Sequence, residues 1–264
     1  MFNVQNLMQV LEEFAPLELS YKMIARGDYD NSGIIVNTHQ SVKGVLFALD
    51  LTEQVVNRAK RLKCDTIITH HPAIYAPIKK IDCDDAITSA ILLSIKNNLN
   101  VISMHLNLDV ADNGIDYYLA EGLGSTKCKI LDYLDDTHGY GREFTLPNTK
   151  LSDFINNIKK TFKTNKIIVY GNKNFCFNKV ASFCGAGGSC AEKCVNQKLT
   201  DAQVIVSSDM PHHIVKELVC NNKVVIILPH YASELYGFKK FYERVAEKIN
   251  STAQTYFFED KRLL

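Results

Sequence analysis

Three apolar segments of this chain run directly into histidine, and this pattern constrains the fold more than any other feature. The three segment–histidine pairs are residues 65–69 with His70, residues 100–104 with His105, and residues 223–228 with His230 two positions on. Each segment has the length and apolar content of a buried strand. In open α/β sheets, side chains just beyond the carboxyl ends of the strands meet at one edge. The pattern therefore predicts a sheet edge that gathers histidines.

The side chains at these three strand ends can supply ligands to a divalent metal. Two of the histidines are followed four residues later by a carboxylate, a spacing that puts both side chains on one face of a helical turn. Imidazole nitrogen and carboxylate oxygen suit zinc, iron, manganese, nickel or cobalt. The candidate ligands are His70, His71, His105, Asp109, His230 and Glu234.

This set is larger than one four-ligand shell, which favours two metal ions sharing a bridging carboxylate. Glu234 is the better candidate bridge, because its side chain is longer than that of Asp109. A histidine left over from the ligand set would orient another ligand.

Strand and helix patterns alternate along the first 130 residues. The expected strands are 33–36, 44–49, 65–69 and 100–104, and the expected helices are 3–14, 52–62, 85–97 and 115–123. A β-α-β-α order implies a parallel sheet with right-handed crossovers.

A second α/β unit is expected after residues 131–148, which are polar and rich in turn residues and are interpreted as a connection with a short strand near 142–146. The expected helices are 151–162, 190–198, 211–220 and 232–249, and the expected strands are 166–170, 179–183, 202–206, 223–228 and 254–258. We therefore predict an α/β fold with two lobes, 1–130 and 131–264. Interweaving of the lobes, with the C-terminal segment packing back on the first, is also compatible with this pattern.

Composition narrows the class of protein. The 264 residues carry a net charge of +1, so there is no strong electrostatic signal for a nucleic-acid partner. No segment has the sequence pattern of a signal peptide or a membrane-spanning helix. The eight cysteines are scattered, as in a reduced cytoplasmic protein.

Three further features have two interpretations each. The glycine-rich segment 185–189 would either bind a phosphate at a helix N-terminus or permit close packing, and packing is favoured. Cys190 and Cys194 are interpreted as buried thiols rather than metal ligands. Asp50 either supports the site or caps the helix that follows it, together with Thr52.

The chain resembles the NIF3-like family (DUF34), whose members are also called GTP cyclohydrolase 1 type 2 homologues. The matching segments occur in the family's order and are residues 29–35, 45–52, 65–72, 105–109 with Asn113-Gly114, and 230–234. The resemblance implies two α/β lobes with mostly parallel or mixed sheets flanked by helices, and a metal site at strand carboxyl ends between the lobes. It also implies ring-shaped homo-oligomers, often hexamers.

The resemblance further implies a dinuclear metal centre and assigns its ligands. These would be His70, His71, Asp109, His230 and Glu234, with His105 beside the metals. Tyr29 departs from the family's usual Trp, Pro229 from its usual Gly, and Ser207-Ser208-Asp209 from its usual Thr-Gly-Asp/Glu. The last departure leaves open any substrate contacts of Asp209, His212 and His213.

Two functions fit these expectations. The first is a metal-dependent hydrolase acting on a nucleotide or a related phosphorylated or heterocyclic small molecule. In that case His105 would serve as the catalytic proton-transfer group, because imidazole titrates near neutral pH. The second is a non-enzymatic metal-binding chaperone or regulator that acts through protein partners.

Overall fold

The computed structural model describes residues 2–264, whose contacts divide the chain into two compact units. Unit 1 contains the chain up to Ala111 together with Phe238–Glu259, and unit 2 contains Asp112–Gly237 and Asp260–Leu264. The expected division at residue 130 differs from this grouping, in which residues 112–130 belong to the second unit. A C-terminal segment, Phe238–Glu259, groups with the N-terminal residues.

Unit 1 is built on a five-stranded sheet with the order β1-β4-β3-β2-β11. The strands are β1 (Gly33–Val36), β2 (Gly44–Ala48), β3 (Thr66–Thr69), β4 (Asn100–Ser103) and β11 (Gln254–Phe257). β4, β3, β2 and β11 are parallel, and β1 pairs with β4 in the antiparallel sense at one edge. The parallel strands therefore end at a common edge.

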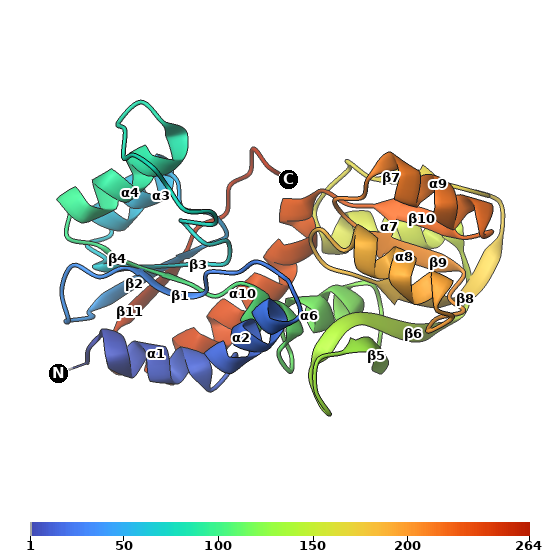
Figure 1. The fold of residues 1–264 in the computed structure, drawn as a ribbon, viewed down its shortest axis with the longest axis horizontal. Coiled ribbons are helices and arrows are strands. Elements are labelled where there is room, and N and C mark those ends of the chain that lie inside the picture. Colours follow the sequence, from blue (N-terminus) through green and yellow to red (C-terminus); the bar gives the residue numbers. More distant parts are fainter. Residues whose placement is uncertain (1) are drawn as a thin grey trace. The chain divides into compact units, whose positions relative to one another are not determined.

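Helices cover both faces of this sheet (Figure 1). The helices of unit 1 are α1 (Val4–Glu12), α2 (Leu17–Ala25), α3 (Glu53–Arg61), α4 (Ala86–Lys96), α5 (Leu106–Val110) and the part of α10 (His230–Ile249) that follows Gly237. Alternation along β2 explains the two layers, because neighbouring side chains point to opposite faces. Leu46 packs in a cluster with Val55 of α3, whereas the ring of Phe47 lies 6.2 Å from that of Phe238 in α10.

Unit 2 contains a six-stranded mixed sheet with the order β5-β6-β8-β9-β10-β7. Its strands are β5 (Cys128–Tyr133), β6 (Gly139–Lys150), β7 (Ile168–Tyr170), β8 (Cys176–Ser182), β9 (Val204–Ser207) and β10 (Val224–Ile227). β8, β9 and β10 pair in the parallel sense, whereas β5–β6, β6–β8 and β10–β7 are antiparallel pairs. The helices are α6 (Ile115–Gly122), α7 (Leu151–Thr161), α8 (Gly188–Asn196), α9 (His212–Cys220) and the first turns of α10.

Helices α8 and α9 pack on the sheet of unit 2 through a shared apolar cluster. Ala191 of α8 and Leu218 of α9 are buried together with Ala181, Ile205 and Val225 from the three parallel strands. Because helices cover the sheet here, β9 and β10 are buried along nearly their whole length, which accounts for their largely apolar sequences.

The structure corrects two expectations. Residues 131–148 are not a connection but lie mainly in the antiparallel hairpin β5–β6, which turns at residues 134–138. β5 lies at a sheet edge, where half-exposed strands carry polar residues, so their sequence resembles a loop. Residues 17–25, assigned to no element, form α2.

Among residues 2–264, we find no helix with both the length and the apolar character that crossing a bilayer requires.

Candidate metal centre

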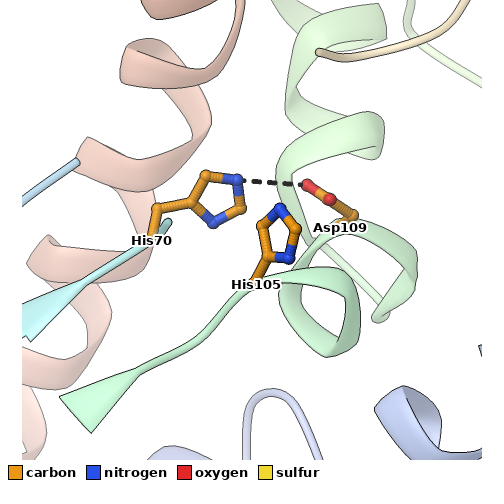
Figure 2. A group of neighbouring side chains, drawn as sticks. All are labelled: His70, His105 and Asp109. Carbon is orange, nitrogen blue, oxygen red and sulfur yellow. Dashed lines mark ion pairs between the residues drawn. The ribbon is translucent and has the colours of Figure 1, made fainter. Parts of the chain in front are cut away.

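Two neighbouring parallel strands of unit 1 deliver histidines to the same edge of the sheet. β3 ends at Thr69, which is paired with Ser103 at the end of β4. His70 and His71 follow β3 directly, and His105 follows β4 at the start of α5. One ligand atom each from His70, His105 and Asp109 lies within 4.8 Å of the others (Figure 2).

The short helix α5 places His105 and Asp109 on one turn, as their spacing predicts. The Asp109 amide donates to the His105 carbonyl at 2.9 Å. The buried side chain of Asn107 holds this turn in place, because its Nδ2 donates to the Ala15 carbonyl at 2.7 Å. The turn is therefore anchored to the N-terminal helices rather than free to move.

Each histidine of the unit 1 cluster is held through Nδ1 by an oxygen atom. The contacts are from His70 to the Met104 carbonyl at 2.8 Å, from His71 to Asp50 Oδ1 at 2.7 Å, and from His105 to Asp30 Oδ1 at 2.7 Å. A carbonyl or a carboxylate can only accept, so Nδ1 carries the proton in each ring. This tautomer directs the lone pair of Nε2 toward a possible metal, the arrangement found in metal-binding histidines.

Asp30 is a buried carboxylate with three hydrogen-bonding side chains around it. Besides His105, Ser20 Oγ donates to Asp30 Oδ2 at 2.5 Å and Ser32 Oγ donates at 2.7 Å. Burial would raise the pKa of Asp30, but the hydrogen bonds from His105 and Ser20 outweigh this effect and lower it. Asp30 therefore stays ionised and fixes the orientation of the His105 ring.

The separation of donor atoms in unit 1 fits a shared metal ion. His70 Nε2 lies 3.4 Å from Asp109 Oδ1, as the dashed line in Figure 2 shows. Two ligand atoms bound at about 2.1 Å in tetrahedral geometry are about 3.4 Å apart. Both side chains are buried, so the pair is shielded from bulk water.

Unit 2 contains a histidine–carboxylate pair of its own on the first turn of α10. His230 Nε2 lies 2.9 Å from Glu234 Oε1, and His230 Nδ1 donates to Asp209 Oδ2 at 2.7 Å. Adjacent ligands at about 2.1 Å in octahedral geometry are about 3.0 Å apart. The donor chemistry and the carboxylate-held Nδ1 are the same as in unit 1.

Gly185, in the glycine-rich turn after β8, lies directly against this pair. Its φ is +54°, and a Cβ built there would overlap Glu234 Oε1 and lie 3.2 Å from His230 Nε2. The Gly185 carbonyl accepts from the Asp209 amide at 3.2 Å. The glycine is therefore required for close approach, which supports the packing interpretation of segment 185–189.

A buried ion pair between Asp116 and Arg142 supports the glycine-rich turn after β8. Asp116 of α6 accepts from the Cys184 amide at 3.2 Å, and its Oδ2 lies 3.5 Å from Nε of Arg142 on β6. Burial raises the pKa of Asp116 to about 6, although Arg142 and the Cys184 amide act in the opposite direction.

The predicted site residues fall into two groups. His70, His71, His105 and Asp109 cluster in unit 1, where the ring centroids of His71 and His105 lie 5.9 Å apart. His230 and Glu234 form the pair in unit 2. His212 and His213 are exposed at the start of α9.

The sequence analysis assigned no role to Asp30, although this residue lies in a segment that matched the family.

The structure also answers the other two questions that the sequence left open. Asp50 contacts His71 while Thr52 caps α3, accepting from the Val55 amide. Cys194 is buried in the core of unit 2, with its sulfur 4.0 Å from that of Cys190.

Taken together, the fold and the clustered side chains define a two-unit α/β protein with buried histidine and carboxylate groups that could bind metal. The sequence profile of the family described as Duf34/NIF3 (NGG1p interacting factor 3) matches residues 2–262. The chain belongs to this family.

Relatives and solved structures agree with this assignment. A Clostridium acetobutylicum protein named GTP cyclohydrolase 1 type 2 homolog is 30% identical over 88% of this chain and 85% of its own length. A Clostridium perfringens protein of the same name is 28% identical over 95% and 94%. A NIF3-related Bacillus cereus structure superposes with a TM-score of 0.87 at 20% identity, over 98% of this chain and 97% of that one. Reduced HcgD from Methanocaldococcus jannaschii superposes with a TM-score of 0.78 at 26% identity, over 98% of each chain.

Proposed function

We propose that this protein binds two divalent transition-metal ions per chain and uses them in hydrolysis of a small molecule. The residues that would hold them are His70, His71 and Asp109 of unit 1, and His230 and Glu234 of unit 2. Zinc, iron, manganese, nickel and cobalt all suit this donor set, which contains no thiolate.

One observation carries the proposal. In all four histidines of the two groups, Nδ1 donates a hydrogen bond to an oxygen atom. This oxygen belongs to a carboxylate in three cases and to a backbone carbonyl in the fourth. A histidine–carboxylate contact alone is not diagnostic, because His138 and Asp135 make one at 2.9 Å on a hairpin turn. What distinguishes His70 and His230 is that a buried carboxylate lies beside Nε2, Asp109 at His70 and Glu234 at His230.

The chemistry expected of such a centre is hydrolytic. Divalent ions with these ligands lower the pKa of water toward neutrality and polarise a substrate oxygen. We assign proton transfer to His105, and the hydrogen bond from its Nδ1 to Asp30 supports this role by orienting the ring. The names of the curated relatives suggest a nucleotide or a related heterocyclic compound as substrate.

The proposal is tested by adding nucleotides, including GTP, to metal-loaded protein and measuring hydrolysis. We expect activity that a chelator abolishes and added metal restores. His105→Ala should keep its metal and lose activity by about 100-fold or more, whereas the control His138→Ala should keep both. Metal-loaded protein with no turnover on any nucleotide would reject the hydrolase and favour a non-enzymatic metal chaperone or regulator.

The family resemblance also leads us to propose a ring-shaped homohexamer. Sedimentation at micromolar concentration should show one species about six times the 29.8 kDa chain mass. A monomer in the same experiment would reject the ring.

A further inference from the structure

Two tyrosines beside the unit 1 histidines are each about half exposed. Tyr29 is 47% exposed and Tyr75 is 52% exposed. Their ring centroids lie 4.9 Å apart in an edge-to-face arrangement. The Tyr75 ring is also edge-to-face with the ring of His105, at 6.1 Å. The two tyrosines therefore form an aromatic surface, here called the tyrosine pair, next to the proposed proton-transfer group.

The loops that carry the tyrosine pair are fixed to each other and to the site. Asn31, two residues after Tyr29, donates from Nδ2 to the carbonyl of Ile74 at 2.7 Å, immediately before Tyr75. Ser32 Oγ accepts from the amide of His105 at 3.1 Å. These bonds hold both aromatic residues in a defined position relative to His105, so a ligand bound on them would be placed without further ordering.

The chemistry of the tyrosine pair fits a planar ring. An exposed aromatic face stacks on any base or heterocycle, and such a contact contributes about 1–3 kcal/mol per base. Half of two tyrosine side chains amounts to roughly 200 Å², enough for one heterocycle but far below the roughly 800 Å² per partner of a stable protein interface. The surface therefore suits a small molecule better than a second copy of the chain.

We propose that Tyr29 and Tyr75 bind the planar heterocyclic ring of the substrate and place it beside His105. This inference rests on the proposed function for its reaction, but the binding step itself depends only on unit 1. It narrows the substrate class to compounds with a flat heteroaromatic ring and assigns Tyr29 and Tyr75 as the residues that select for it.

The test is calorimetric titration of metal-loaded protein with four probes that carry a heteroaromatic base, namely AMP, GMP, CMP and UMP, and with ribose 5-phosphate, which has no base. We expect at least one nucleotide to bind 10-fold or more tightly than ribose 5-phosphate. Tyr29→Ala and Tyr75→Ala should each lower the affinity for that nucleotide by about 5- to 150-fold. The affinity for ribose 5-phosphate should stay unchanged. Tyr29→Phe and Tyr75→Phe should stay close to wild type, because they retain the ring.

Tyr133→Ala is the matched control, since Tyr133 is 52% exposed but lies on β5 of unit 2. The inference is overturned if no nucleotide binds better than ribose 5-phosphate, or if the alanine variants bind nucleotide as wild type does. It is also overturned if those variants change the sedimentation of the protein and not its nucleotide affinity, because the pair would then cover another copy.

Metal content measured on the same samples separates this inference from the proposed function. Nucleotide binding that depends on the tyrosines in protein unable to hold metal would support the tyrosine pair and reject the metal centre. Bound metal without a tyrosine-dependent preference for nucleotides would support the metal centre and reject the tyrosine pair.

Discussion

Asp30 Oδ1 accepts a hydrogen bond from His105 Nδ1 at 2.7 Å, although the two residues lie 75 positions apart in the chain. Asp30 also accepts from Ser20 and Ser32, so one buried carboxylate joins α2, the loop before β1 and the start of α5. The same contact therefore orients the proposed proton-transfer group and stabilises unit 1.

Replacing this carboxylate by an amide should cost stability. Asp30→Asn loses the charge that three donors share, and we expect the free energy of unfolding of metal-free protein to fall by about 1–3 kcal/mol at pH 7. Urea denaturation measures this change. Asp82→Asn is the control, because the Asp82 side chain contacts Lys80 and the Asp84 amide in an exposed loop; it should stay within about 0.5 kcal/mol of wild type. Equal stability of the two variants would contradict the role given to Asp30.

Asp50 should act on metal affinity without binding metal itself. Asp50→Asn leaves His71 without its charged acceptor, and we expect metal affinity to fall by about 10- to 100-fold. Competition with a chromophoric chelator measures the affinity. Asp135→Asn removes the equivalent partner of His138 and should leave the affinity unchanged; a similar loss in both variants would show a general electrostatic effect instead.

Gly185 should be irreplaceable for reasons beyond its backbone conformation. Gly185→Ala would push a methyl group into Glu234 Oε1, so we expect both lower stability and loss of bound metal. Gly27→Ala provides the control, since Gly27 also has positive φ (+103°) but has no atom within 4 Å of its built Cβ. That variant should show only the backbone cost, about 1–2 kcal/mol, with its metal retained. Full metal occupancy in Gly185→Ala would contradict the close contact.

The buried Asp116 should make stability depend on pH. Its pKa is about 6 in the folded protein, against 3.8 for the ordinary group, so the folded state holds the proton more tightly than the unfolded state. This contribution to stability is complete below about pH 4, falls as the pH rises through 6, and is absent above it. At 1.36 kcal/mol per pKa unit, the difference amounts to at most about 3 kcal/mol.

Unfolding of metal-free wild type and Asp116→Asn, measured from pH 4 to pH 8, tests this dependence. Metal-free samples are used so that titration of the ligands cancels between the two proteins. We expect the stability of wild type relative to the variant to decrease as the pH rises and to level off above pH 7. A difference that stays constant with pH would contradict the raised pKa.

The sequence predicts the parallel core of each unit because those strands are buried on both faces and have apolar residues at consecutive positions. Residues 66–69 and 100–103 are examples in which every position is buried. It fails at β5, since an edge strand needs only one apolar face and its remaining residues resemble a loop. Of β6 it predicts only the part near residues 142–146. The assignment of residues 112–130 to unit 2 depends on packing of α6 against β6, which leaves no local signal.

Strand ends of one parallel sheet lie together, which accounts for the predicted clustering of His70 and His71 after β3 with His105 after β4. The third strand that leads to a histidine, β10, belongs to the other sheet. The groups that hold the ligands could not be predicted in the same way. Asp30 and Asp209 reach their histidines from other segments of the chain, and no periodicity links them. A carboxylate in a loop has many uses, so only the three-dimensional contact identifies its role.

Elemental mass spectrometry of bound metal, on protein purified without a chelating tag, tests the central claim most directly. The variants to compare with wild type are His71→Ala and Glu234→Gln, with His138→Ala as control. We predict about two divalent ions per chain in wild type and in the control, and loss of metal in both ligand variants. Wild-type protein without metal, and unable to take it up on reconstitution, would contradict the assignment of these histidines and carboxylates as a metal centre.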